Sequence, residues 1–96
     1  SGIYLYGNGS NEATIGCNNF KDNRYGIYVT GNANPGIHRN NFLRNQEAGI
    51  YNAGDAVVAA EDNWWGNEAG PGHDGDVVYG NVVATPWLRP WVCWVP

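Results

Sequence analysis

The sequence predicts an all-β fold, a right-handed parallel β-helix in which about four short coils stack into a solenoid. Two recurring phrases and the alternation of side chains inside them support this prediction. The first phrase reads IGCNNF at 15–20, IHRNNF at 37–42 and AAEDNW at 59–64, a step of 22 residues each time. The second phrase reads GIYL at 2–5, GIYV at 26–29 and GIYN at 49–52, with steps of 24 and 23.

Alternation with a period of two favours strands over helices. The inward positions of the second phrase carry isoleucine, namely Ile3, Ile27 and Ile50. The next position points outward and carries tyrosine, namely Tyr4, Tyr28 and Tyr51. A leucine-rich repeat has a similar length but requires a lattice of leucines, which this chain lacks.

Stacked coils place equivalent side chains above one another, which predicts ladders of asparagine at the corners. The first predicted ladder contains Asn18, Asn40 and Asp62. The second predicted ladder contains Asn23, Asn45 and Asn67. The same spacing predicts an inward aromatic stack of Phe20, Phe42 and Trp64.

One β-helix segment is expected over 1–96, with coils at about 1–25, 26–48, 49–75 and 76–88 and a cap at 86–96. The cap prediction rests on the large side chains that would cover the last coil, Trp87, Trp91 and Trp94, and on the neighbouring prolines. The N-terminal end has no comparable residues. We therefore expect a homo-oligomer, end-to-end stacking through the open N-terminal coil, or preceding coils.

A series of motifs follows the third coil: DNWWG at 62–66, GP at 70–71, GDVV at 75–78, GNV at 80–82 and PWL at 86–88. The repeated phrases resemble those of the pectin-lyase-like superfamily of right-handed parallel β-helix proteins. The series of motifs resembles the C-terminal coils and cap of secreted or surface β-helix proteins. The resemblance implies an extracellular or cell-surface location in a bacterium or archaeon.

Composition argues against some partners. The net charge is −4 and no basic cluster occurs, which disfavours nucleic acid because phosphate neutralisation dominates such binding. No apolar run reaches the roughly 20 residues that cross a bilayer, so membrane insertion is not expected. A disulfide between Cys17 and Cys93 would need Cα atoms within about 7 Å, and two free thiols are the simpler expectation.

Residues suited to catalysis are sparse. The lyases that the chain resembles need a base and a cation, but no lyase motif surrounds Lys21, Arg24, Arg39 or Arg44, and solvated turn charges are favoured. Asp74 and Asp76 are weak candidates for Ca²⁺, and a turn with an Asp-Gly corner is the simpler interpretation. We predict no catalytic residue and no cofactor.

The outward tyrosines are the best candidate for binding, because aromatic side chains spaced along a solenoid suit sugar rings. The predicted carbohydrate-binding residues are Tyr4, Tyr28, Tyr51 and Arg39. A structural role for the stacked tyrosines is the competing interpretation. The leading hypothesis is a non-catalytic segment, structural or polysaccharide-binding, and the alternative is the C-terminal part of a polysaccharide lyase or another carbohydrate-active enzyme.

Overall fold

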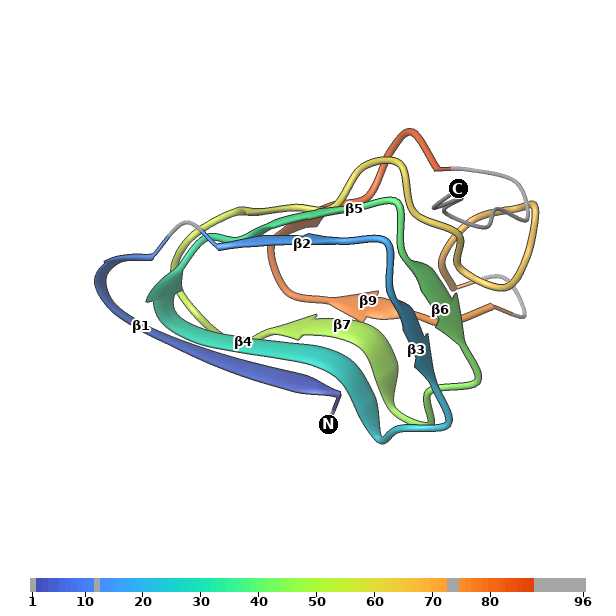
Figure 1. Ribbon diagram of the computed structural model, residues 1–96, viewed down its shortest axis with the longest axis horizontal. Helices are drawn as coiled ribbons and strands as arrows, with labels where there is room; N and C mark the ends of the chain where they lie inside the picture. The colour runs from blue at the N-terminus through green and yellow to red at the C-terminus, as the bar shows by residue number, and fades with distance from the viewer. Residues whose placement is uncertain (1, 12, 73–74, 88–96) are drawn as a thin grey trace.

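The computed structural model describes residues 2–11, 13–72 and 75–87, and its regular structure is entirely β. The chain passes through β1, β2 and β3, turns into β4 and repeats the same circuit (Figure 1). About three turns are complete, and β9 and β10 begin another, so the chain has fewer full coils than the four predicted. The predicted fold class is confirmed.

Three parallel sheets line the circuit. Sheet A contains, in spatial order, β1 (Ile3–Asn11), β4 (Tyr25–Ala33), β7 (Ala48–Asn52) and β9 (Val78–Tyr79). Sheet B contains, in spatial order, β2 (Thr14–Gly16), β5 (Gly36–His38), β8 (Val58–Ala59) and β10 (Val82–Val83). Sheet C contains β3 (Asn19–Lys21) and β6 (Asn41–Leu43), and a bridge from Asn41 to Trp64 extends it.

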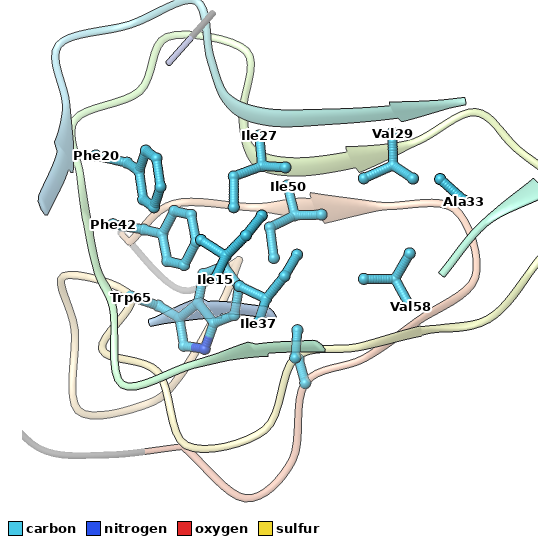
Figure 2. Close-up of a cluster of buried hydrophobic side chains, with 12 residues drawn as sticks. Ile15, Phe20, Ile27, Val29, Ala33, Ile37, Phe42, Ile50, Val58 and Trp65 are labelled. Carbon is cyan, nitrogen blue, oxygen red and sulfur yellow. The ribbon is translucent and has the colours of Figure 1, made fainter. Parts of the chain in front are cut away.

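The register of sheet A explains why the second phrase recurs. Ile3 pairs with Ile27, Ile27 with Ile50, and Ile50 with Val78. Each strand therefore places its inward aliphatic residue above the same residue type in the next coil. Ile27 and Ile50 are fully buried. They belong to the same core cluster as Ile15 and Ile37 of sheet B (Figure 2).

An aromatic stack fills the core beside sheet C (Figure 2). The rings of Phe20 and Phe42 lie 5.2 Å apart between centroids, and those of Phe42 and Trp65 lie 4.6 Å apart. The prediction that Trp64 completes this stack is wrong, because Trp64 pairs with the outward Asn41. The third coil has one more residue than the repeat step of 22 allows, and this moves Trp65 into the inward position.

The glycine that opens the second phrase is required by this stack. A Cβ atom at Gly26 would lie 2.5 Å from the carbonyl oxygen of Gly49 and 3.0 Å from the ring of Phe42. A Cβ atom at Gly2 would lie 2.8 Å from Phe20, and one at Gly49 would lie 3.1 Å from Trp65. The aromatic rings thus pack directly on the backbone of sheet A, where no side chain fits.

The first asparagine ladder runs along the corner between sheets B and C. Asn18 donates its backbone N–H and its Nδ2 to Oδ1 of Asn40, at 3.0 and 3.2 Å. Asn40 donates in the same way to Oδ1 of Asn63, at 2.9 and 3.2 Å. The prediction that Asp62 is the third member is wrong, again because of the extra residue. Asn63 ends the ladder fully buried.

The second ladder runs along the corner between sheets C and A. The backbone N–H of Asn23 donates to Oδ1 of Asn45, and the backbone N–H and Nδ2 of Asn45 donate to the carboxylate of Asp76. The prediction that Asn67 follows Asn45 is wrong. The chain leaves the solenoid after Trp65, and the next corner position falls on Asp76, whose own N–H donates to the Trp65 carbonyl at 2.8 Å.

Of the three predicted cap residues, Trp91 and Trp94 lie outside the described residues. Trp87 donates Nε1–H to the Glu68 carbonyl at 2.9 Å, and its ring lies directly against Gly70. Trp87 therefore packs against, and hydrogen-bonds to, the segment that follows Trp65. Its role as a cap for the last coil stays a prediction.

Candidate functional site

The tyrosines mark one face of the molecule. All six belong to the strands of sheet A: Tyr4 and Tyr6 in β1, Tyr25 and Tyr28 in β4, Tyr51 in β7 and Tyr79 in β9. Tyr4, Tyr6 and Tyr79 expose 62, 63 and 51% of their surface, and the other three are half-buried. We call this set the tyrosine strip.

The centre of the tyrosine strip is a regular stack. Tyr4, Tyr28 and Tyr51 follow one another at 5.2 Å between ring centroids, with planes inclined by only 5° and 1°. Tyr79 continues the column at 5.7 Å but tilts by 55°. Because each inner ring is covered on both faces by its neighbours, the stack presents ring edges and phenol groups to a ligand rather than open aromatic faces.

Tyr25, which lies outside the stack, packs against its side. The ring of Tyr25 meets those of Tyr28 and Tyr51 edge-on, at 5.3 and 5.5 Å and 67°. The guanidinium of Arg24 lies 5.3 Å from the centre of the Tyr25 ring, within the range of a cation–π contact. These contacts limit the rotation of Tyr28 and Tyr51, so the strip is organised before any ligand arrives.

Sequence reasoning identified only part of this surface. It selected Tyr4, Tyr28 and Tyr51, which the structure brings together. It missed Tyr6, Tyr25 and Tyr79. The signal for Tyr79 was available, since Val78-Tyr79 repeats the Ile-Tyr pair of the earlier coils. The contact of Tyr25 had no such signal, because it depends on how the chain turns into β4.

Arg39, the fourth predicted carbohydrate-binding residue, does not join the tyrosine strip. It lies in the turn between β5 and β6, where a hollow of about 420 Å³ borders sheet B. The described lining residues are Thr14, Ile15, Gly16, Cys17, His38, Arg39 and Asp62. The structure thus separates the predicted binding residues onto two surfaces.

Of the two candidate metal ligands, the structure describes only Asp76. Asp74 lies outside the described residues. Asp76 is buried, and both carboxylate oxygens accept hydrogen bonds from Asn45. Burial raises the pKa of Asp76, while the bonds from Asn45 and the charge of Arg44 oppose this rise. Within the described ranges, no group of three or more His, Cys, Asp or Glu side chains could hold a metal ion.

Two further sequence expectations concern cysteine and charge. Cys17 is disulfide-bonded, so the expectation of two free thiols is wrong. Arg44 pairs with Asp22 at 3.0 Å and lowers the pKa of that carboxyl group. Both members of this ion pair are well exposed, so it contributes little to stability.

No helix capable of crossing a membrane occurs in the portion of the chain that the structure describes.

Parallel strands stacked coil upon coil, with inward ladders of isoleucine, aromatic residues and asparagine, define the class of right-handed parallel β-helix proteins. The family model described as "Right handed beta helix region" matches residues 1–82. The chain belongs to this family. Comparison with curated proteins gives no match, and comparison with solved structures gives none either.

Proposed function

We propose that this chain is a non-catalytic β-helix segment of an extracellular or cell-surface protein and that its tyrosine strip binds polysaccharide. One observation carries the proposal: all six tyrosines lie on the strands of a single sheet. A purely structural stack would need only the half-buried members, yet Tyr4, Tyr6 and Tyr79 are more than half exposed. Concentrated exposed aromatic surface of this kind is typical of binding sites.

The chemistry of the strip favours a sugar polymer. Each coil contributes one phenol group to the central stack, in which the rings of Tyr4, Tyr28 and Tyr51 follow one another at 5.2 Å. A phenol group both donates and accepts hydrogen bonds, and the ring edge beside it is apolar. A chain of sugars offers hydroxyl groups and C–H surface in a repeating order, which complements a repeating row of tyrosines.

The disulfide at Cys17 supports the proposed location. Disulfides form and persist in oxidising environments and are rare in the cytosol of most organisms. An extracellular location also brings the tyrosine strip into contact with cell-wall and matrix polysaccharides.

We expect the double variant Tyr28→Phe/Tyr51→Phe to lose most of its retention on polysaccharide while unfolding at the same temperature as the parent. Phenylalanine keeps the stacked rings and the contacts with Tyr25, so the fold loses no packing. It removes two hydroxyl groups, each of which contributes roughly 0.5–1.5 kcal/mol when hydrogen-bonded. Affinity electrophoresis in gels containing xylan, glucomannan, pectate or alginate measures the retention.

Asn19→Ala is the matched control, because Asn19 is exposed on sheet C, away from the strip. This control should migrate like the parent. The variant Tyr4→Ala tests the ring at the N-terminal end of the stack, where only Tyr28 stacks on it among the described residues. If neither the double variant nor Tyr4→Ala changes retention on a gel that slows the parent, the tyrosine strip is not the binding surface.

The same polysaccharides test the alternative that the chain belongs to a lyase. Elimination leaves an unsaturated sugar that absorbs ultraviolet light, so pectate and alginate can be monitored directly during incubation. Steady product formation by the purified chain would replace the non-catalytic proposal with the enzymatic one.

We also propose that the N-terminal face associates with a second copy of the chain. Among the described strands, β1 lies at the edge of sheet A with one side unpaired. Ile15 and Phe20 in the first coil expose 7 and 6% of their surface, whereas Ile37 and Phe42 in the second expose none. The amides of Asn18 and Asn23 also lie at this face, and an amide both donates and accepts, so two copies can pair through identical groups.

Sedimentation of the chain at increasing concentration should therefore show a monomer–dimer equilibrium. The variant Leu5→Lys places a charge beside this half-buried edge and should shift the equilibrium to monomer. The variant Val83→Lys, at an exposed position of β10, should behave like the parent. A parent chain that stays monomeric over the whole concentration range contradicts the proposal.

A further inference from the structure

The hollow beside sheet B has a charge arrangement that the tyrosine strip does not explain. Cys17, Arg39 and Asp62 occupy equivalent corners of successive coils, and each has φ of 61°. The backbone N–H of Arg39 donates to the Asp62 carbonyl at 2.7 Å. Arg39 and Asp62 therefore lie side by side on neighbouring coils, with Cα atoms about 4.8 Å apart, the spacing of neighbouring strands.

These two opposite charges do not neutralise each other. The ion pair between described residues joins Arg44 to Asp22, and neither Arg39 nor Asp62 has an ion pair or side-chain hydrogen bond. Both side chains are exposed, and both line the hollow of about 420 Å³. A guanidinium and a carboxylate are thus carried by neighbouring corners of the solenoid and line one opening, and neither makes a side-chain hydrogen bond to a described residue.

The imidazole of His38 completes the polar lining. Its Nδ1 lies 2.8 Å from the Glu61 carbonyl oxygen, which can only accept, so Nδ1 carries the proton. In the neutral ring the other nitrogen, Nε2, is then an acceptor. Beside it, a Cβ atom at Gly16 would meet the His38 carbonyl oxygen at 3.2 Å and no other atom of the described residues within 4 Å.

We propose that this hollow binds a free α-amino acid as its zwitterion. The α-carboxylate pairs with Arg39, the α-ammonium group pairs with Asp62 and donates to Nε2 of His38, and the side chain lies over Gly16 and Ile15. A zwitterion carries two opposite charges on adjacent atoms, which is the complement of two opposite charges on adjacent corners. A volume of about 420 Å³ lies within the roughly 300–1,000 Å³ typical of ligand pockets.

Three ligands that differ by one charge test the proposal on the full chain. L-alanine carries both charges, N-acetyl-L-alanine keeps only the carboxylate, and L-alanine methyl ester keeps only the ammonium group. We expect L-alanine to bind saturably, measured by the imidazole resonances of His38 in NMR titration. Each blocked ligand should bind about tenfold more weakly or worse, because one charged hydrogen bond is lost.

Two variants should each remove the advantage of L-alanine over one of the blocked ligands. Arg39→Asn removes the cation and should make L-alanine bind no better than its methyl ester. Asp62→Asn removes the anion and should make L-alanine bind no better than its N-acetyl derivative. Asparagine tolerates the positive φ of both corners, so both variants should fold. Arg24→Asn, beside Tyr25, is the control and should bind like the parent.

Equal shifts from all three ligands, no saturable shift from L-alanine, or unchanged binding by Arg39→Asn would each overturn the proposal. The test is independent of the tyrosine strip, because the hollow borders sheet B and the strip lies on sheet A. Retention of Arg39→Asn on polysaccharide gels should equal that of the parent.

Discussion

Replacement of Gly26 by alanine is expected to lower the free energy of unfolding by about 3 kcal/mol. The new methyl group would lie 2.5 Å from the carbonyl oxygen of Gly49, a backbone atom, and 3.0 Å from the ring of Phe42. Neither neighbour can withdraw, because Phe42 is stacked between Phe20 and Trp65 and the Gly49 backbone is held in sheet A. Denaturation in urea measures the change.

Gly36→Ala is the matched control, since Gly36 also lies in a strand. Among the described residues, a Cβ atom there would meet only the side chain of His38, at 3.4 Å, which is an ordinary contact. We expect this variant to be as stable as the parent or up to about 1 kcal/mol more stable, because alanine restricts the unfolded chain. Similar urea midpoints for the two variants would show that the aromatic stack does not press on sheet A as described.

Replacement of Asp76 by asparagine is expected to stabilise the protein at neutral pH. Asp76 occupies the corner that Asn23 and Asn45 occupy in the preceding coils, and its oxygens accept the N–H and Nδ2 groups of Asn45. Asparagine can accept the same bonds through Oδ1 without carrying a buried charge. Asp76→Ala leaves the donors of Asn45 unsatisfied and should lower the free energy of unfolding by about 1–3 kcal/mol.

The gain from Asp76→Asn should depend on pH. Burial raises the pKa of Asp76 above 3.8 in the folded protein, so its contribution to stability is fully present below 3.8 and is lost as pH rises through the raised value. Asparagine does not titrate. The variant and the parent should therefore differ least at acidic pH and most at neutral pH, as thermal unfolding at several pH values can measure.

A constant difference across this pH range would contradict a raised pKa for Asp76. The pair of Asp22 and Arg44 provides an internal comparison, because the pKa of Asp22 is lowered rather than raised. Its contribution is present above 3.8 and lost as pH falls through the lowered value. Asp76→Asn leaves that part of the pH profile unchanged, so the two carboxyl groups can be separated.

The sequence was sufficient for the fold because stacking makes each coil repeat its inward residues. Ile27 and Ile50 could be placed without any structure, since the outward Tyr28 and Tyr51 alternate with them. The same assumption of a constant step produced the errors in the third coil. A step of 22 from Asn40 leads to Asp62, whereas the ladder residue is Asn63, one position further along the chain.

The candidate site was harder to predict for a physical reason. Repetition indicates that Tyr4, Tyr28 and Tyr51 form a column but not how their rings face, and the parallel planes show that edges rather than faces meet the solvent. Arg39 was grouped with the tyrosines because both are outward. The sequence contains no measure of the angle between sheets, which places Arg39 at another corner.

The chain leaves the solenoid after Trp65 and re-enters it at Asp76, and these two residues are joined by the hydrogen bond between the Asp76 N–H and the Trp65 carbonyl. The two points of attachment are thus held together directly by a backbone hydrogen bond, and not only through the peptide between them. We expect such a junction to tolerate an insertion in the segment between Trp65 and Asp76 without a shift of the strands that follow. It is also a natural position for grafting a foreign peptide for display, because the coils on either side would keep their register.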